Sequence, residues 1–112
     1  MARKIVELQR VDLNQGLNVT FVTPSSVSDG FALDFSAQDE RTVALFKGTG
    51  TVTIKQGNGI QGVVDCDTIT INGLTVFRLD SGAYKNVTGA DKGYVVAIPS
   101  ANTVEAAVIR LP

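Results

Sequence analysis

The chain has 112 residues, one cysteine and no histidine, and its 10 basic and 11 acidic residues give a net charge of −1. This length fits a single domain, residues 1–112, that can bury a core without disulfides. The balanced charge argues against a nucleic-acid partner, and no segment approaches the ~20 apolar residues of a membrane span, which argues against a membrane partner.

Apolar and polar residues alternate at the N-terminus. In the segment 4–10, Val6 and Leu8 fall on one face of a predicted strand and Ile5 falls on the other. A small domain cannot cover both faces of such a strand. We therefore expect residues 1–15 to form an arm or an edge strand that contacts a partner.

The same period-two alternation continues along the chain and predicts about nine strands. They are expected at residues 4–10, 17–23, 31–35, 42–47, 51–55, 68–71, 74–79, 93–98 and 104–110. The pair Asn72-Gly73 lies between two of them and predicts a two-residue hairpin, because both residues tolerate positive φ. The predicted fold class is all-β, an antiparallel β-sandwich of the jelly-roll or Ig-like kind.

The predicted core consists of the apolar residues on the inward phase of these strands. They are Val6, Leu8, Val19, Phe21, Phe31, Leu33, Phe35, Val43, Leu45, Val52, Ile54, Ile69, Ile71, Val76, Val95, Val108 and Ile109.

Residues 57–62 match the GxGxxG pattern of a dinucleotide-binding loop. A phosphate-binding loop of that kind must lead into a helix, whose N-terminal N–H groups hold the anion. Here the loop leads through Val63 and Val64 toward another predicted strand, so we expect no nucleotide and no other cofactor. We expect this loop to face solvent or a partner, with positive φ at one or more of Gly57, Gly59 and Gly62.

The sequence offers little for catalysis or metal binding. Without histidine, the commonest general base is absent. Asp65 and Asp67 flank Cys66 and would raise the pKa of its thiol, so we expect an inert cysteine. The acidic residues lack the dense spacing of a calcium loop, and the few aromatic residues do not suggest a sugar-binding catalytic cleft. We expect no catalytic residue and no metal site, hence a protein that is not an enzyme.

Candidate partner contacts lie in two regions. Tyr84 and Lys85 open a polar loop bounded by glycines, which fits either a plain hairpin turn or a contact loop with an exposed aromatic. Ile5 and the last predicted strand, with Ala107, Ile109 and Leu111, carry apolar residues that one small domain cannot cover. Self-association through these apolar residues is the resulting expectation.

Three segments resemble a family of small β-sandwich head decoration or minor capsid proteins of tailed bacteriophages. They are residues 39–46 (DERTVALF), 55–65 (KQGNGIQGVVD) and 79–95 (LDSGAYKNVTGADKGYV). The chain departs from the family pattern at Gln56, where a small residue is usual, and at Ala83-Tyr84, where the pattern has Arg-Phe. The second change removes one cationic contact.

The resemblance implies a β-sandwich that binds the major capsid protein as a trimer or dimer on the capsid surface of the virion. Such a protein would be made in the reducing host cytoplasm and would stabilise the head by binding across capsomers. Two alternatives come from other classes. One is a carbohydrate- or receptor-binding β-sandwich module of a fibre or surface protein, and the weaker one is an enzyme that uses carboxylates around Asp65 and Asp67.

Overall fold

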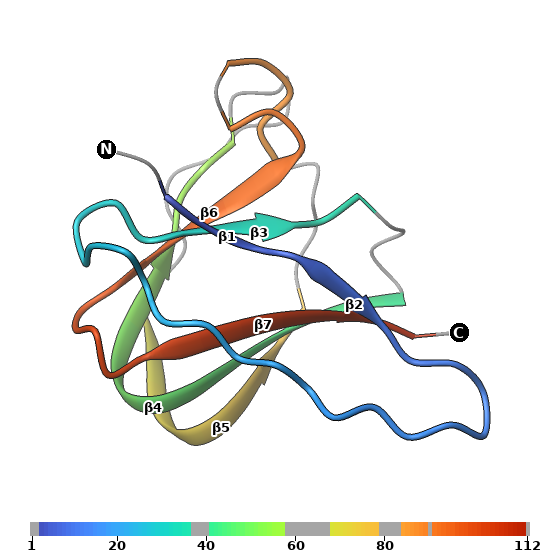
Figure 1. Ribbon diagram of the computed structural model, residues 1–112. Helices are drawn as coiled ribbons and strands as arrows, with labels where there is room; N and C mark the ends of the chain where they lie inside the picture. The colour runs from blue at the N-terminus through green and yellow to red at the C-terminus, as the bar shows by residue number, and fades with distance from the viewer. Residues whose placement is uncertain (1–2, 37–40, 58–67, 79–83, 90, 112) are drawn as a thin grey trace.

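A computed structural model describes residues 3–36, 41–57, 68–78, 84–89 and 91–111. All the named elements are strands, so the all-β prediction is confirmed (Figure 1). They are β1 (Lys4–Val6), β2 (Leu8–Arg10), β3 (Phe31–Asp34), β4 (Thr42–Ile54), β5 (Ile69–Phe77), β6 (Tyr94–Pro99) and β7 (Glu105–Arg110).

The strands form one mixed sheet in the order β1-β3-β6-β4-β7-β2, with β5 paired to β4 outside this path. Only Glu7 separates β1 from β2, yet β1 pairs in parallel with β3 and β2 pairs in parallel with β7. The N-terminal stretch therefore joins both ends of the strand order, and the sheet curls toward a barrel (Figure 1). The described strands thus form a mixed sheet of seven strands, which differs from the predicted antiparallel arrangement of nine.

Strand β4 is the central element of this sheet. Its first half, Thr42 to Lys47, pairs with β7, and its last residues, Val52 to Ile54, pair with β6. The sequence predicts two strands here, but Gly48 and Gly50 adopt positive φ and let a single strand bend between its two neighbours. Glycine is the residue that permits such a bend, because a side chain would strain this backbone conformation.

The predicted hairpin at Asn72-Gly73 is wrong. Strand β5 runs through both residues, and all nine of its residues pair in antiparallel register with β4. Gly73 has φ of +81° and lies opposite Gly48, so both strands bend at the same pair of residues. An Asn-Gly pair tolerates positive φ whether the chain reverses or only coils, and pairing with β4 selects the second outcome.

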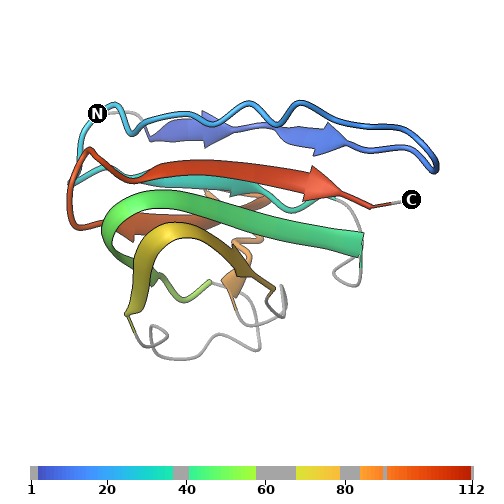
Figure 2. The same cartoon turned by 90° about the horizontal axis from the view of Figure 1, so that it is seen from below.

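The strand predicted at 17–23 is also absent. This segment runs beside β2 and β7 and makes a single β-bridge, in which Val22 and Ala106 exchange backbone hydrogen bonds of 2.9 Å. The Gln9 side-chain amide bonds both backbone groups of Thr20, at 2.8 and 2.9 Å, and so replaces the next rung of a ladder. Figure 2 shows this segment and β1–β2 together as a layer on one side of the molecule.

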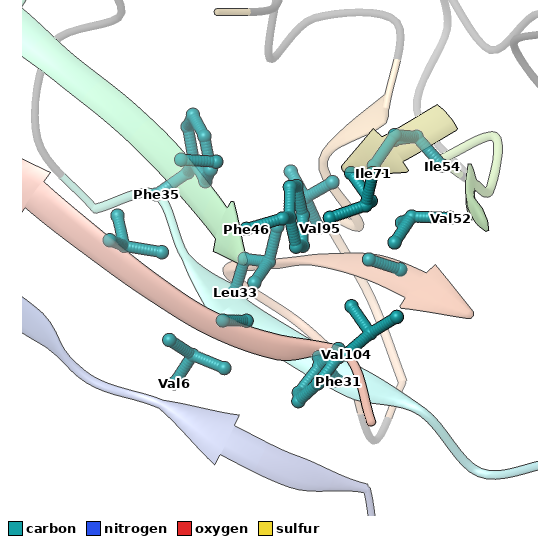
Figure 3. Close-up of a cluster of buried hydrophobic side chains, with 14 residues drawn as sticks. Val6, Phe31, Leu33, Phe35, Phe46, Val52, Ile54, Ile71, Val95 and Val104 are labelled. Carbon is teal, nitrogen blue, oxygen red and sulfur yellow. The ribbon is translucent and has the colours of Figure 1, made fainter. Parts of the chain in front are cut away.

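The core lies inside the curled sheet and includes buried residues from every strand except β2, whose partly buried Leu8 packs against it (Figure 3). Phe31, Phe35 and Phe46 are its largest fully buried side chains. Of the predicted core, eleven residues are buried: Val6, Phe31, Leu33, Phe35, Val43, Leu45, Val52, Ile54, Ile71, Val95 and Val108. Five more are partly buried: Leu8, Val19, Phe21, Ile69 and Ile109.

Val76 contradicts the core prediction, because 58% of it is exposed. The opposite error concerns Phe46, which the prediction omits although it is completely buried. The Phe46 error arises because Val43 and Leu45 suggest a single inward phase for this part of β4, whereas the folded chain covers both of its faces.

Candidate interaction surfaces

The N-terminal candidate, Ile5, lies on the outer face of β1 and is half exposed. Beside it is a groove of about 320 Å³ between β1 and the backbone near Thr20 and Val22. The backbone of β1 pairs with β3 on one edge, and this groove lies toward the segment around Val22. The sequence prediction of an apolar residue left outside the core is therefore confirmed for Ile5, and its contact with a partner stays a prediction.

Tyr84 and Lys85 occupy a different environment from the predicted exposed loop. Tyr84 is half-buried and packs against the core. Lys85 forms an isolated bridge with Val95, and its Nζ donates a 2.7 Å hydrogen bond to the Phe35 carbonyl. These contacts tie the start of the loop to the barrel. The exposed residues in the described part of this loop are instead Val87, Thr88, Gly89 and Lys92.

The last strand is more deeply covered than its sequence suggests. Ala107 is completely buried and Ile109 is half-buried, whereas Leu111, just beyond β7, is exposed. On the neighbouring strand β4, the Lys47 ammonium lies 4.5 Å from the centre of the Phe21 ring. Ala107 therefore cannot supply the residual apolar surface that the sequence predicts.

Leu111 belongs to one end of the sheet that also gathers cationic side chains. Arg10 on β2 pairs in register with Arg110 on β7, and the Leu111 amide donates a 2.6 Å hydrogen bond to the Arg41 carbonyl. The loop after β2 and the C-terminus lie at the same end in both views (Figures 1 and 2). We call this surface the arginine–leucine end, made of Arg10, Leu13, Arg41, Arg110 and Leu111.

Leu13 is the most exposed large apolar residue described, at 73%. A turn fixes its position: the Gln15 amide donates to the Asp12 carbonyl at 3.1 Å, and Asn14 adopts a left-handed φ of 62°. The Arg10 guanidinium also bonds the Asp12 carboxylate at 2.8 Å. Among the described residues, neither Arg41 nor Arg110 makes an ion pair, and the exposed Leu13 and Leu111 lie at the same end.

The outer face of β5 is a second exposed apolar surface. Leu74 and Val76 are 64% and 58% exposed, while Ile71 on the opposite face is buried. Figure 2 places β5 on the opposite side of the molecule from β1 and β2. Leu74 and Val76 therefore form an exposed apolar pair on the side of the molecule away from β1 and β2.

A polar concavity of about 500 Å³ lies near the loop before β6. Its lining residues are Arg3, Ser28, Lys55, Gln56, Asn86, Asp91, Val96 and Ile98. The Arg3 Nε donates to the Asp91 carboxylate at 3.2 Å, which holds the chain start against this loop. The lining contains no aromatic ring, so the concavity lacks the flat apolar surface on which sugars commonly stack.

The described residues bring no three metal-binding side chains together, and they contain no helix long and apolar enough to cross a membrane. Asp65, Cys66, Asp67, Gly59 and Gly62 lie outside the described residues, so the predictions for them stay predictions. Gly57 is described and is buried, which contradicts the expected outward-facing position. It also lacks positive φ, and a Cβ at Gly57 would instead collide with the backbone of Tyr84 and Lys85.

Comparison with known proteins identifies no relative: no family model, no curated protein and no solved structure matches this chain.

Proposed function

We propose that this chain is a non-enzymatic structural protein of a tailed-phage virion, a decoration protein that binds the major capsid protein across capsomers. The structural observation that supports this proposal is the arginine–leucine end. It presents two exposed leucines, on backbone held by hydrogen bonds, together with Arg41 and Arg110, which make no ion pair among the described residues. The sequence resemblance over residues 39–46, 55–65 and 79–95 supplies the class of partner.

Leu13 would act as an apolar anchor in this role, because its turn is already ordered before binding and little entropy is lost. Arg41 and Arg110 would meet acidic side chains of the shell, since charge complementarity fixes orientation and raises the association rate. Binding across capsomers adds free energy that must be lost before the shell opens. In this proposal, the fold that binds the capsid is the mixed all-β sheet and not the sandwich that the resemblance implies. The protein assembles on the virion in the host cytoplasm.

The test uses purified heads of the phage that carries this gene, prepared without the protein. We expect saturable, stoichiometric rebinding of the wild-type chain that weakens as salt rises. The double variant Arg41→Glu/Arg110→Glu should bind about tenfold more weakly or worse, which corresponds to about 1.4 kcal/mol. The matched control is Lys92→Glu, an exposed cation on the loop before β6, and it should bind like the wild type.

Absence of wild-type rebinding would overturn the proposal as a whole. Equal loss in the Lys92→Glu control would show that total charge, and not the arginine–leucine end, controls binding.

The polar concavity beside Arg3 and Asp91 favours a second candidate, a carbohydrate- or receptor-binding module. Tyr84 packs against the core, and neither tyrosine lines this concavity. The candidate therefore ranks below capsid binding. A glycan array that detects a ligand lost in Asn86→Ala, and retained in Tyr84→Ala, would promote it above the capsid proposal.

A further inference from the structure

The second edge of β5 is the longest strand edge that remains open in the described part of the molecule. All nine residues of β5 pair with β4 on one side, and no described strand pairs with the other side. The sequence of β5, ITINGLTVF, contains no charged residue and no proline. Its register with β4 is continuous and therefore contains no bulge.

Natural proteins usually protect such an edge with lysine, proline, a bulge or a very short strand. The two end strands of the sheet order show this protection, because β1 and β2 have three residues each and carry Lys4 and Arg10. Strand β5 has none of these devices. An open, uncharged edge of this length is suited to pairing with another strand.

We propose that two copies of this chain pair antiparallel along β5, around a twofold axis perpendicular to the sheet. The absence of charge on β5 favours a second copy of this chain as the strand that pairs with its open edge. An isologous contact brings each residue close to its own equivalent, so a charged surface repels itself, whereas β5 presents no charge. The arginine–leucine end would place like cations together in such a contact, so it is a poor surface for self-association.

The outer face fixes the register of this pair. Antiparallel residues directly opposite each other share a face, so Leu74 can lie opposite Val76 of the second copy when Thr75 lies on the axis. This register covers both exposed apolar side chains and extends the sheet across the two copies. The contact is small, so we expect dimers to form with rising concentration, with Kd on the order of 10 µM.

Sedimentation equilibrium of the purified chain over about 1–500 µM tests the proposal across the expected Kd. The wild type should pass from monomer to dimer. Leu74→Glu should remain monomeric, and it should stay folded because Lys47 lies opposite position 74 within the chain. The control Leu13→Glu introduces the same charge at a comparably exposed leucine far from β5, and it should still dimerise.

A charge pair tests the register. Val76→Lys alone should also be monomeric, whereas Leu74→Glu/Val76→Lys should regain the dimer, since the new carboxylate of one copy faces the new ammonium of the other. Thermal melts confirm that each variant is folded, and Leu74→Thr replaces Leu74→Glu if the latter is not. A monomeric wild type, or a dimer lost only in Leu13→Glu, overturns the proposal, and a monomeric double variant overturns the register.

This inference is independent of capsid binding. A chain that binds heads but stays monomeric in every condition would contradict the β5 pairing alone. A chain that dimerises through β5 but does not bind heads would contradict only the capsid proposal.

Discussion

Strands β7 and β5 pair with the two edges of β4, and they differ in how far their side chains are buried. In β7, residues Ala106 to Val108 are buried; Ala106 and Val108 belong to the core, and the edge of β7 away from β4 is paired with β2 and Val22. In β5, only the inward face is covered, and Leu74 and Val76 remain exposed. Both strands are apolar, so hydrophobicity alone does not decide which becomes interior.

Backbone pairing accounts for part of the difference. The second edge of β7 is occupied by β2 and by Val22, which exchanges backbone hydrogen bonds of 2.9 Å with Ala106. Larger residues on the outer face of β5 leave an apolar surface that a partner can cover. β7 is therefore an internal strand of the folded chain, whereas β5 is the strand that we propose for assembly.

The largest expected effect is a difference in stability between a substitution at a buried residue of β4 and one at an exposed residue of β5. Phe46→Ala should lower the free energy of unfolding by about 3–5 kcal/mol, because Phe46 is completely buried and its loss leaves a cavity. Val76→Ala, at an exposed site, should change stability by no more than about 0.5 kcal/mol in dilute solution. Urea unfolding measures both, and a similar loss for the two variants would contradict the proposed difference.

A second test compares two glycines that lie directly opposite each other. A Cβ at Gly48 would collide with the Thr103 carbonyl oxygen, whereas a Cβ at Gly73 would meet no atom within 4 Å. Both have positive φ, so both alanine variants carry about 1–2 kcal/mol of backbone strain. Gly48→Ala should therefore cost about 1–3 kcal/mol more than Gly73→Ala in chemical denaturation. Equal midpoints would refute the close packing at Gly48.

Gly57→Ala should cost about 1–3 kcal/mol through overpacking, since its Cβ would collide with the backbone of Tyr84 and Lys85. Gly16→Ala is the matched control, because a Cβ there meets nothing within 4 Å and Gly16 lacks positive φ. Differential scanning calorimetry measures the stability of both variants.

Calorimetric titration with NAD or ATP should show no binding to the wild type, and binding that disappears in Gly59→Ala would restore the nucleotide-loop interpretation.

A smaller effect is expected at Lys85. Its ammonium donates to the Phe35 carbonyl at 2.7 Å in a partly buried setting. Lys85→Met keeps most of the apolar stem and removes this charge-assisted bond, so it should cost about 1–2 kcal/mol. Lys92→Met, at an exposed position on the same loop, serves as the control in thermal melts. If both variants melt together, the Lys85 contact contributes nothing to stability.

Local sequence predicts which segments are strands more successfully than it predicts how the strands pair. Alternation places β3, β6 and β7 within a residue or so of their observed bounds. It cannot show that β4 and β5 each continue through glycines, because that outcome depends on the register between them. The parallel pairings of β1 and β2 likewise depend on strands distant in sequence.

The candidate surfaces were predictable to a similar degree. Ile5 and Leu111 break the inward pattern at strands, so their exposure could be expected. Leu13 lies in a loop where no periodicity marks it. The sequence separates Arg41 from Arg110, and only the β4–β7 pairing brings them to one end.

Hydrogen–deuterium exchange at low and high protein concentration tests the contrast between β5 and β7 most directly. We predict that amides in β7 are protected at both concentrations, whereas those of Ile69–Phe77 that face the open edge exchange quickly in the monomer and gain protection as the dimer forms. Exchange in β5 that is slow and independent of concentration, or protection that rises only around Leu13 and Leu111, would contradict the assignment of β5 as the assembly strand.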